Sequence, residues 1–462
     1  MKNLFCIIFI LLIPVSLFAS QNSDYDKFLN FSDIHFDPFS DTVIVDELKN
    51  SDYTQWEKIF QNSDNKTYSS YGSDCNFYLF QSALKDMSER IPNPDFVIIT
   101  GDFMSHNFNE NFEKYTGIKD QDSLNKFIEK TIRFITTMIV NSFPNTNIFP
   151  TVGNDDAYCG NYMIDPEGEF LKMTAKVWQP IVNMKSNNQN FEKDFAKGGY
   201  CISNISENTN YKIIILNTVF FSSKYKNHCG DTSADPGADA LKWLTETLEV
   251  CKNNQQKVYL SYHIPPGIDI YATINGKGNC EEKIFSSWKE NYTKEFIDII
   301  KKYQNNIIAA FAGHFHRDDF RLFYENEEPV SFLHITSSIS PIYGNNPSYQ
   351  IFTYDKSDFS LINFETYYLK NISIPDSAKW TFEYDFQNCY RQDSISSSSL
   401  NSVYKSIQSD SSYRVKYIEY YTSSSTSTFE KDYINWKYNW CGIKYFTKEE
   451  YAKCFCKLSG RR

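Results

Sequence analysis

The sequence of 462 residues lacks several features that would place it in large classes of proteins. Beyond the first twenty residues it has no apolar run of membrane length, so we expect the mature protein to be soluble. It has no paired Cys-x-x-Cys motifs that would indicate a cysteine zinc site, and no internal repeat is visible. Asp and Glu (57) outnumber Lys and Arg (46), and the net charge of −11 argues against a nucleic acid polymer as a partner. With 41% hydrophobic residues the chain can bury one large core and a smaller unit, and no obligate protein partner is indicated.

The first twenty residues have the composition of an export signal. Lys2 precedes an apolar run from Leu4 to Phe18, and the small residues Ala19 and Ser20 follow it. This order predicts a cleaved signal peptide over residues 1–20, with an uncleaved anchor as the alternative. We therefore expect the protein outside the cell, with a lysosome-like acidic lumen as a second destination.

Cysteine usage and glycosylation sequons agree with export. Ten cysteines remain after the predicted signal peptide, and an even number in an exported chain predicts up to five disulfides. Asn30 begins a sequon but falls in a predicted core strand, so we expect it to stay unmodified. The other sequons begin at Asn65, Asn204, Asn291 and Asn371.

Short apolar runs alternate with helical patterns over residues 21–370. Each run has the length of a strand and a nearly continuous apolar character, which is typical of strands covered on both faces. The helical patterns, such as Phe77, Phe80 and Leu84, place apolar residues three and four positions apart. This alternation predicts an α/β catalytic domain. The predicted strands are Phe28–Ile34, Phe96–Thr100, Ile148–Val152, Tyr211–Leu216, Val258–Tyr262, Ile307–Ala312, Phe332–Thr336 and Tyr349–Tyr354.

The composition changes beyond residue 370. Serine-rich stretches at Ser394–Ser399 and Ser423–Ser427 and an aromatic cluster around Trp436 and Trp440 replace the alternating pattern. Four of the cysteines lie in this tail. We predict that residues 371–462 form a small, disulfide-tied, mainly helical C-terminal subdomain with mobile serine loops.

Histidine, acidic and amide residues gather just beyond the predicted strands. In open α/β sheets ligands bind at the carboxyl ends of strands, so this placement indicates a site. Glycines in three of the segments let the backbone turn sharply as it leaves the strand. The segments are Phe31-Ser-Asp33-Ile-His35, Thr100-Gly-Asp102, Val152-Gly-Asn154-Asp155, Ser261-Tyr-His263 and Ala312-Gly-His314-Phe-His316.

Two of these segments carry donors at positions i and i+2, which point to the same side of an extended backbone. Imidazole nitrogens together with carboxylate and amide oxygens suit zinc, with manganese or iron as alternatives. Seven donors are more than one catalytic zinc ion needs, but they suffice for two ions that share a carboxylate. The predicted metal ligands are Asp33, His35, Asp102, Asn154, His263, His314 and His316.

The ordered set resembles the signature of the calcineurin-like metallophosphoesterases: D-x-H, G-D, G-N-[H/D], H and G-H-x-H. This resemblance implies a four-layer sandwich in which two mixed β-sheets face each other and helices flank them. It also implies how two Zn²⁺ ions are shared. Asp33, His35 and His316 would hold one ion, Asn154, His263 and His314 the other, and Asp102 would bridge both.

A narrower resemblance is to acid sphingomyelinase and its sphingomyelinase-like phosphodiesterase relatives. It rests on the cysteine-bearing tail and on five segments: Gly101-Asp-Phe-Met-Ser-His106, His263-Ile-Pro-Pro-Gly267, Gly313-His-Phe-His-Arg-Asp-Asp-Phe320, Ser340-Pro-Ile-Tyr343 and Asn346-Pro-Ser-Tyr349. We expect no saposin-like lipid-binding module, because the first metal motif begins soon after the predicted signal peptide. Tyr343 and Asn346 would help to bind substrate, although a turn explains Asn346 equally well.

The family chemistry implied by this resemblance is attack on a phosphodiester by a water molecule activated between two metal ions. A general acid should speed departure of the leaving alkoxide by about two to four orders of magnitude. Many relatives carry a histidine after the motif asparagine, whereas this chain carries Asp155. His106 matches a second active-site histidine of the sphingomyelinase group and is our preferred acid. Asp155 would orient His106, or would itself act as the acid in an acidic compartment.

Two other histidines and three cysteine pairs lie outside the predicted ligand set. His228 and His334 match no part of the signature, and we expect packing or surface roles for both. The cysteine pairs that would brace the site are Cys229–Cys280, Cys75–Cys159 and, on weaker grounds, Cys201–Cys251, although sequence alone does not fix connectivity.

The sequence is compatible with three functions. The first is an exported zinc phosphodiesterase that cleaves sphingomyelin to ceramide and phosphocholine, for which the aromatic tail would supply peripheral membrane contact. The second has the same chemistry on nucleotides or other soluble phosphodiesters. The third is a metal-binding pseudoenzyme, which only the change at Asp155 supports.

Overall fold

The computed structural model describes residues 24–185, 188, 190–205, 210–227 and 235–459. The predicted signal peptide at residues 1–20 lies outside the described residues, as do His228 and Cys229. Within the described part of the chain, no helix combines the length and the apolar character needed to cross a bilayer.

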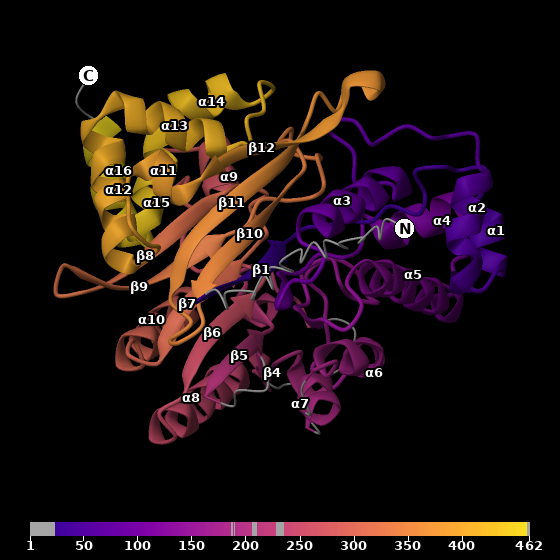
Figure 1. Ribbon diagram of the computed structural model, residues 1–462, viewed down its shortest axis with the longest axis horizontal. Helices are drawn as coiled ribbons and strands as arrows, with labels where there is room; N and C mark the ends of the chain where they lie inside the picture. The colour runs from indigo at the N-terminus through magenta and orange to yellow at the C-terminus, as the bar shows by residue number, and fades with distance from the viewer. Residues whose placement is uncertain (1–23, 186–187, 189, 206–209, 228–234, 460–462) are drawn as a thin grey trace, which may run out of the picture.

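Two six-stranded mixed sheets form the centre of the fold (Figure 1). Their strand orders are β12-β11-β10-β1-β2-β3 and β4-β5-β6-β7-β9-β8. All eight predicted strands are present. The strands are β1 (Tyr25–Phe31), β2 (Phe96–Ile99), β3 (Asn147–Pro150), β4 (Cys201–Asn204), β5 (Tyr211–Leu216), β6 (Lys257–Tyr262), β7 (Ile307–Ala312), β8 (Asp319–Glu325), β9 (Glu328–Ile335), β10 (Ser348–Asp355), β11 (Leu361–Lys370) and β12 (Lys379–Asp385).

The two sheets face each other across an aromatic core. The ring of Phe28 in β1 lies 5.6 Å from that of Phe311 in β7 and 6.0 Å from that of Tyr259 in β6. All three side chains are fully buried. Parallel pairing joins β1 to β2 and β3 in one sheet and β5, β6, β7 and β9 in the other. Because parallel strands end at the same edge, the loops that follow them meet between the sheets.

Helices flank both sheets. In Figure 1, α3, α5 and α6 lie to one side of the molecule and α8 and α10 below the second sheet. Side chains at the helix starts satisfy free backbone groups: Asn76 accepts from the backbone N–H of Leu79, and Asp120 accepts from that of Ser123. The four-layer arrangement is confirmed. These helices are α1 (Val45–Asn50), α2 (Trp56–Asn62), α3 (Phe77–Arg90), α4 (Phe108–Thr116), α5 (Gln121–Ser142), α6 (Glu169–Val182), α7 (Phe191–Gly198), α8 (Pro236–Asn253), α9 (Ile270–Asn275) and α10 (Glu290–Lys302).

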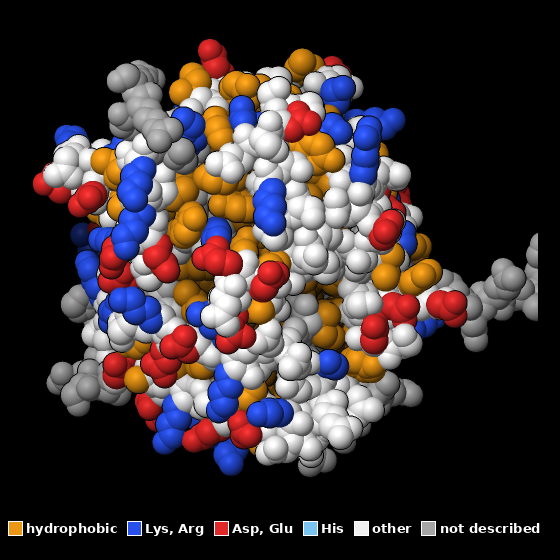
Figure 2. All heavy atoms as spheres, turned by 90° about the vertical axis from the view of Figure 1, so that its left-hand side faces the viewer, with side chains coloured by type: hydrophobic (Ala, Val, Ile, Leu, Met, Phe, Trp, Pro, Cys, Tyr) orange, Lys and Arg blue, Asp and Glu red, His pale blue; other side chains and the backbone are white. Residues whose placement is uncertain are grey.

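The C-terminal region is helical, but it is joined to the first sheet. The sheet continues beyond the predicted boundary at residue 370, because β12 pairs with β11. The serine stretch at 394–399 is a loop only in its first half, because a helix begins at Ser397 and Ser396 caps it through a reciprocal bond with Ser399. Figure 2 shows acidic, basic and hydrophobic side chains interspersed on the face that carries this region. The helices are α11 (Phe386–Tyr390), α12 (Ser397–Ser409), α13 (Ser411–Tyr421), α14 (Phe429–Ile434), α15 (Trp436–Lys444) and α16 (Lys448–Ser459).

Two disulfides tie the last helices to the molecule. Cys441 bonds to Cys454 and joins α15 to α16, whereas Cys280 bonds to Cys456 and joins the segment after α9 to α16. The predicted Cys229–Cys280 pair is therefore wrong. The reason is tertiary: α16 folds back onto the segment after α9, and no spacing in the sequence reports this proximity.

The other two predicted pairs are wrong as well. Cys75, Cys201, Cys251 and Cys389 are free thiols, and the first three are buried. Cys159 is disulfide-bonded, but not to Cys75. Burial explains why the free thiols persist, because it raises the pKa of Cys75 and Cys201 and so disfavours the reactive thiolate.

Candidate metal centre

Five of the predicted ligands lie in loops with unusual backbone conformation. Asp33, His35, Asp102, His314 and His316 all have positive φ, between 46° and 73°. Such left-handed conformations cost free energy for residues other than glycine and persist where the surrounding structure enforces them. All five positions directly follow β1, β2 or β7, so the strained turns aim their side chains across the strand ends.

The first cluster joins the loops after β1 and β7. The Nε2 atom of His316 lies 3.3 Å from Asp33 Oδ1, and the Nε2 atom of His35 lies 3.8 Å from the same oxygen. Asp33 also accepts hydrogen bonds from the backbone N–H of His314, at 3.0 and 3.1 Å. All three clustered side chains are buried, and their donor atoms lie within 4.8 Å of one another.

The second cluster joins the loops after β2, β3, β6 and β7. His263 Nε2 lies 3.0 Å from Asp102 Oδ2 and 3.0 Å from Asn154 Oδ1. Donor atoms of Asp102, His263 and His314 lie within 4.8 Å of one another. The Nδ2 group of Asn154 donates to Asp155 and Asn161, which turns its carbonyl oxygen toward His263.

Asp102 lies between the two clusters. Its Oδ2 atom is 3.0 Å from His263 Nε2 in the second cluster and 3.5 Å from His35 Nε2 in the first. Its other oxygen accepts the backbone N–H of Asp155 at 2.9 Å, which fixes the carboxylate plane. This is the position that the sequence analysis assigned to a carboxylate shared by two ions.

Backbone carbonyls fix which nitrogen of two histidines faces the site. His35 Nδ1 contacts the carbonyl oxygen of Met104 at 3.0 Å, and His263 Nδ1 contacts that of Thr100 at 2.7 Å. A carbonyl can only accept, so Nδ1 carries the hydrogen in both rings. In the neutral rings Nε2 is therefore left as a lone-pair donor toward the centre, which is the arrangement found in metal sites.

The resulting contacts bring acceptors against acceptors. His263 Nε2 faces the oxygens of Asp102 and Asn154, and His35 Nε2 faces Asp102 Oδ2 at 3.5 Å. Two lone pairs at such distances repel unless a proton or a cation lies between them. The donor set therefore fits two neighbouring metal ions, and nitrogen and oxygen donors of this kind suit zinc.

The pKa values of the clustered side chains also show that the site favours positive charge. Burial opposes the charged form of His263, but the negative charge and hydrogen bond of Asp102 outweigh it and raise its pKa to about 9. Burial likewise opposes charge on His35, and Asp102 and Asp33 raise its pKa well above the ordinary value. The neighbouring histidines hold the pKa values of Asp33 and Asp102 below their usual range despite burial. Ionised carboxylates and displaceable protons are what a metal site requires.

Glycines permit the close approach of these loops. A side chain at Gly313 would overlap Ser32 and come within 2.5 Å of Asp33 Oδ2, and one at Gly153 would overlap Asp102. Both positions lie directly against predicted ligands. Glycine is required there because any Cβ atom would displace the carboxylates.

His106 is held by a residue that the sequence analysis did not identify. Its Nδ1 atom lies 2.9 Å from Asp74 Oδ1, and its backbone N–H donates to Asp74 Oδ2 at 2.8 Å. Burial opposes ionisation of Asp74, but the hydrogen bond and charge of His106 hold its pKa below the usual value. This bond directs His106 Nε2 toward the site, where the ring stacks on His35 at 4.1 Å between centroids.

Asp155 was predicted to orient His106, but in the structure Asp74 holds the ring and Asp155 lies on its other side. Its Oδ2 lies 3.9 Å from His106 Nε2, so it faces the working nitrogen, whereas Asp74 holds the other nitrogen. Burial and the charge of Asp102 raise the pKa of Asp155 well above its ordinary value, and bound cations would act in the opposite direction. Asp156 accepts from the backbone N–H groups of Phe103 and Gly153 and ties the two loops together.

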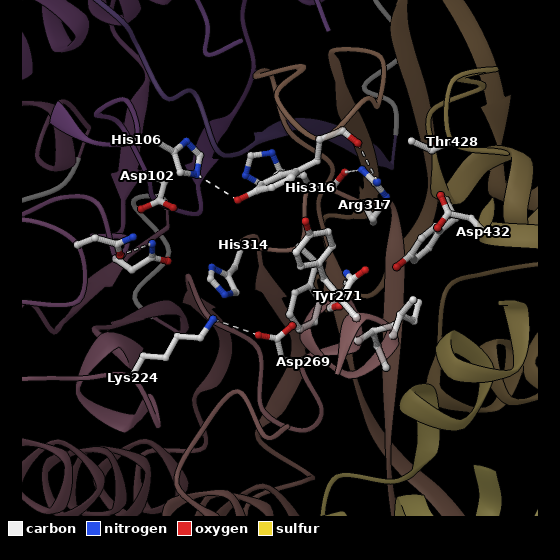
Figure 3. Close-up of a pocket in the computed structure, with 18 of the residues that line it drawn as sticks. Asp102, His106, Lys224, Asp269, Tyr271, His314, His316, Arg317, Thr428 and Asp432 are labelled. Carbon is white, nitrogen blue, oxygen red and sulfur yellow. Dashed lines mark hydrogen bonds and ion pairs between the residues drawn. The ribbon is translucent and has the colours of Figure 1, made fainter. Parts of the chain in front are cut away.

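A pocket of about 240 Å³ opens onto these clusters. Asp102, Asn154, His106, His314 and His316 line its inner end. In Figure 3, Thr428 and Asp432 lie on the side of the pocket away from Asp102, so the C-terminal helix α14 supplies part of the wall. Other lining residues include Tyr162, Lys224, Asp269, Tyr271, Arg317 and Tyr343.

The remaining histidine and the proposed turn residue have structural partners. His334 is buried, and its Nε2 atom bonds to Gln350 at 2.7 Å, in agreement with a packing role. Asn346 donates to the backbone carbonyl of Ser423 at 2.8 Å and does not line the pocket. Tyr343 does line the pocket, with its phenol oxygen 3.4 Å from His106 Nε2.

Strand-end donors on two facing mixed sheets, converging on adjoining clusters, define a metallophosphoesterase type of protein. Residues 26–318 match the model of the calcineurin-like phosphoesterases, and residues 329–460 match that of the acid sphingomyelin phosphodiesterase C-terminal region. The chain belongs to the calcineurin-like phosphoesterase family. The second match confirms the resemblance to the acid sphingomyelinase group.

Several curated relatives match over nearly their whole length. Sphingomyelinase phosphodiesterase D of Dictyostelium discoideum is 28% identical over 87% of this chain and 90% of its own. Acid sphingomyelinase-like phosphodiesterase 3b of Mus musculus is 25% identical over 94% and 91%. A cyclic GMP-AMP phosphodiesterase of Bos taurus is 26% identical over 87% and 84%. Among solved structures, a dimetal phosphatase from Danio rerio has a TM-score of 0.41 at 9% identity, over 74% and 95%.

Proposed function

We propose that the chain is an exported, zinc-dependent phosphodiesterase. The observation that carries this proposal is the set of facing acceptors around Asp102, His263 and Asn154, which calls for cations. Asp33, His35 and His316 would hold one Zn²⁺ ion and Asn154, His263 and His314 the other, with Asp102 between them. When bound, the ions supply Lewis-acid polarisation of the phosphodiester and activation of water.

The chain's own residues supply the remaining chemistry. Asp74 retains the hydrogen on His106 Nδ1, so the proton that His106 gives up leaves from Nε2. That nitrogen lines the pocket beside the clusters, where it can donate to the leaving oxygen. The buried loops exclude water from behind the site, which strengthens every charge interaction there.

Our first candidate substrate is sphingomyelin, cleaved to ceramide and phosphocholine. Apolar side chains stand exposed near the pocket mouth: Tyr271 is 63% exposed, and Ile434 is 71% exposed on α14, which lines the pocket. Tyrosine and aliphatic residues of this kind suit contact with a lipid surface. The predicted aromatic tail is a weaker source of such contact, because Trp440 is buried.

A second candidate is a nucleotide or other soluble, more highly charged phosphodiester. Lys224, Arg317 and Lys431 line the pocket together with the rings of Tyr271 and Tyr343. Cations beside aromatic rings favour an anionic substrate with a flat ring over a zwitterionic lipid headgroup.

Purified protein should be assayed with sphingomyelin vesicles, with nucleotide phosphodiesters and with bis(4-nitrophenyl) phosphate. Whichever natural substrate is correct, we expect hydrolysis of the aryl ester, and we expect a metal chelator to abolish this activity. Faster cleavage of sphingomyelin supports the first candidate, and faster cleavage of nucleotides supports the second. Metal binding without hydrolysis of any of the three would contradict the enzyme and support the pseudoenzyme.

Export is supported by the oxidised cysteines. Disulfides such as Cys280–Cys456 are typical of extracellular or lumenal proteins. The sequon residues Asn65, Asn291 and Asn371 are exposed and Asn204 is half-buried, whereas Asn30 is fully buried in β1. We expect no glycan on Asn30 and glycans among the other four, and mass spectrometry of the secreted protein after deglycosylation would test this.

A further inference from the structure

Tyr162 lies beside the second cluster in a strained conformation that no part of the family signature explains. Its φ angle is +61°, which is rare for an aromatic residue. Two backbone hydrogen bonds hold this conformation: the N–H of Tyr162 donates to the carbonyl of Asn154, and the N–H of Lys226 donates to the carbonyl of Tyr162. The first bond ties this conformation to a predicted ligand loop.

The strained backbone brings the phenol to the centre. The hydroxyl oxygen of Tyr162 lies 3.5 Å from His314 Nε2, and the two rings meet edge to face. The side chain also lines the pocket. A phenol beside a ligand nitrogen lies within reach of whatever the second ion binds.

Lys224 lies against the same tyrosine. Its Nζ atom is 5.4 Å from the centre of the Tyr162 ring and 3.2 Å from Asp269 Oδ2. The other oxygen of Asp269 caps α9 by accepting from the backbone N–H of Ala272 at 2.9 Å. Asp269 is therefore fixed by the helix and holds the ammonium group at the pocket wall.

Lys224, whose ammonium group lies over the Tyr162 ring, lies across His314 from the proposed acid. In Figure 3, His106 and Lys224 lie on different sides of His314, and both line the pocket. A phosphate held at the clusters would meet His106 on one side. Its oxygens on the other side would meet the hydroxyl of Tyr162 and the ammonium group of Lys224.

We propose that Tyr162 and Lys224 form an anion-binding subsite for the non-bridging oxygens of the substrate phosphate. Tyr162 donates a hydrogen bond and Lys224 contributes charge, so both stabilise the negative charge that builds up on these oxygens during reaction. No covalent step is involved. This inference rests on the proposed phosphodiesterase function and adds two binding residues to it.

The test uses Tyr162→Phe, Lys224→Met and the double variant. Two matched controls remove the same groups nearby: Tyr158→Phe in the same loop, and Lys226→Met two residues from Lys224. Neither control residue lines the pocket. We expect kcat/KM on bis(4-nitrophenyl) phosphate to fall about 10-fold to 100-fold in each single variant, with little change in the controls. If both groups act on the same oxygens, the double variant should lose less than the product of the single losses.

Binding of inorganic phosphate to the zinc-loaded protein is the second readout, because it does not depend on turnover. We expect its Kd to rise about 10-fold in each single variant while zinc content stays the same. Unchanged phosphate affinity in both variants would overturn the proposal, and so would loss of one zinc equivalent in Tyr162→Phe, which would make Tyr162 a support of the metal site instead. A wild-type protein that binds phosphate but hydrolyses no phosphodiester would contradict the proposed function and leave this binding comparison decisive.

Discussion

At the residue scale, His106 and Asp74 form a pair in which His106 is the proposed general acid and Asp74 positions its ring. Asp74 accepts both the ring N–H and the backbone N–H of His106, so the ring has little freedom to turn. The same pairing leaves Nε2 directed into the pocket. We therefore expect substitution of His106 to lower kcat more than substitution of Asp74.

We expect His106→Ala to lower kcat by about two to four orders of magnitude on a substrate with a poor leaving group. The loss should be much smaller on a 4-nitrophenyl ester, because that leaving group departs without a proton. Asp74→Asn should give a smaller loss than His106→Ala. Zinc content measured in parallel should not change, and an equal loss on both classes of substrate would remove His106 as the acid.

A second residue-level prediction concerns the pH dependence of metal binding. His263, with a pKa of about 9, and His35, whose pKa is also raised, hold protons near neutral pH before metal binds. Metal binding must displace these protons, so zinc affinity should rise with pH until it passes about 9.

Calorimetric titration with zinc in buffers of different ionisation enthalpy measures the protons released. We expect release of between one and two protons per chain at neutral pH from His263 and His35, and weaker binding at lower pH. Affinity that did not change between about pH 6 and pH 8 would contradict the assignment of these two histidines.

At the scale of elements, the loops at the strand ends carry the predicted metal ligands, and glycine residues allow these loops to approach each other closely. Gly313 follows β7 and lies against Ser32 and Asp33, which follow β1. These contacts cross between the two sheets, so a single methyl group at this position pushes two strand-end loops apart. A side chain at this position should therefore weaken metal binding even where the protein still folds.

We therefore expect Gly313→Ala to weaken zinc binding and to destabilise the protein by a few kcal/mol. Gly117→Ala is the matched control: its φ of +70° also disfavours a side chain, but no atom lies within 4 Å of the added Cβ. The control should lose about 1 kcal/mol of stability and keep its zinc affinity. Equal zinc loss in both variants would show that backbone strain, not close approach, is responsible.

The sequence predicted seven of the eight interior strands, but only β3 among the four edge strands. Strands buried on both faces read as nearly continuous apolar runs, and all eight such runs are strands. Four strands were missed: the edge strands β4, β8 and β12, and β11, which lies between β12 and β10. β4 and β12 are edge strands with alternating buried and half-exposed or exposed residues, and β8 is an edge strand that begins with a buried ion pair between Asp319 and Arg321. Periodicity of this kind is weaker than that of a central strand.

The same contrast holds for the site. Every predicted ligand lies at the centre, because each follows a strand and carries a recognisable motif. Asp74, Tyr162 and Lys224 could not be found in this way, since they lie in loops that only the tertiary fold brings to the pocket. A loop residue has no period and no fixed offset that would report its position.

At the scale of the whole molecule, the C-terminal helices are part of the working pocket. Tyr421, Thr428, Lys431 and Asp432 line its wall, and Cys456 in α16 is bonded to Cys280 near α9. This bond links positions 176 residues apart, so it restricts the unfolded chain strongly. It also anchors the segment that follows a pocket-lining helix.

We expect the double substitution Cys280→Ser/Cys456→Ser to lower the free energy of unfolding by about 2–5 kcal/mol. Thermal unfolding followed by circular dichroism measures this loss. Cys389→Ser, which removes a free thiol from the same region, should have a much smaller effect. A double variant as stable as the wild type would mean that packing alone holds α16 in place.

The central claim is that the strand ends hold a pair of metal ions through Asp102. The most direct measurement is the metal content of the purified protein by inductively coupled plasma mass spectrometry, for the wild type and for the variants Asp102→Ala and Asn154→Ala. We predict about two zinc ions per chain in the wild type, fewer than one in Asp102→Ala and about one in Asn154→Ala. A folded wild-type protein that bound no transition metal, or an Asp102→Ala variant that kept both ions, would contradict the account.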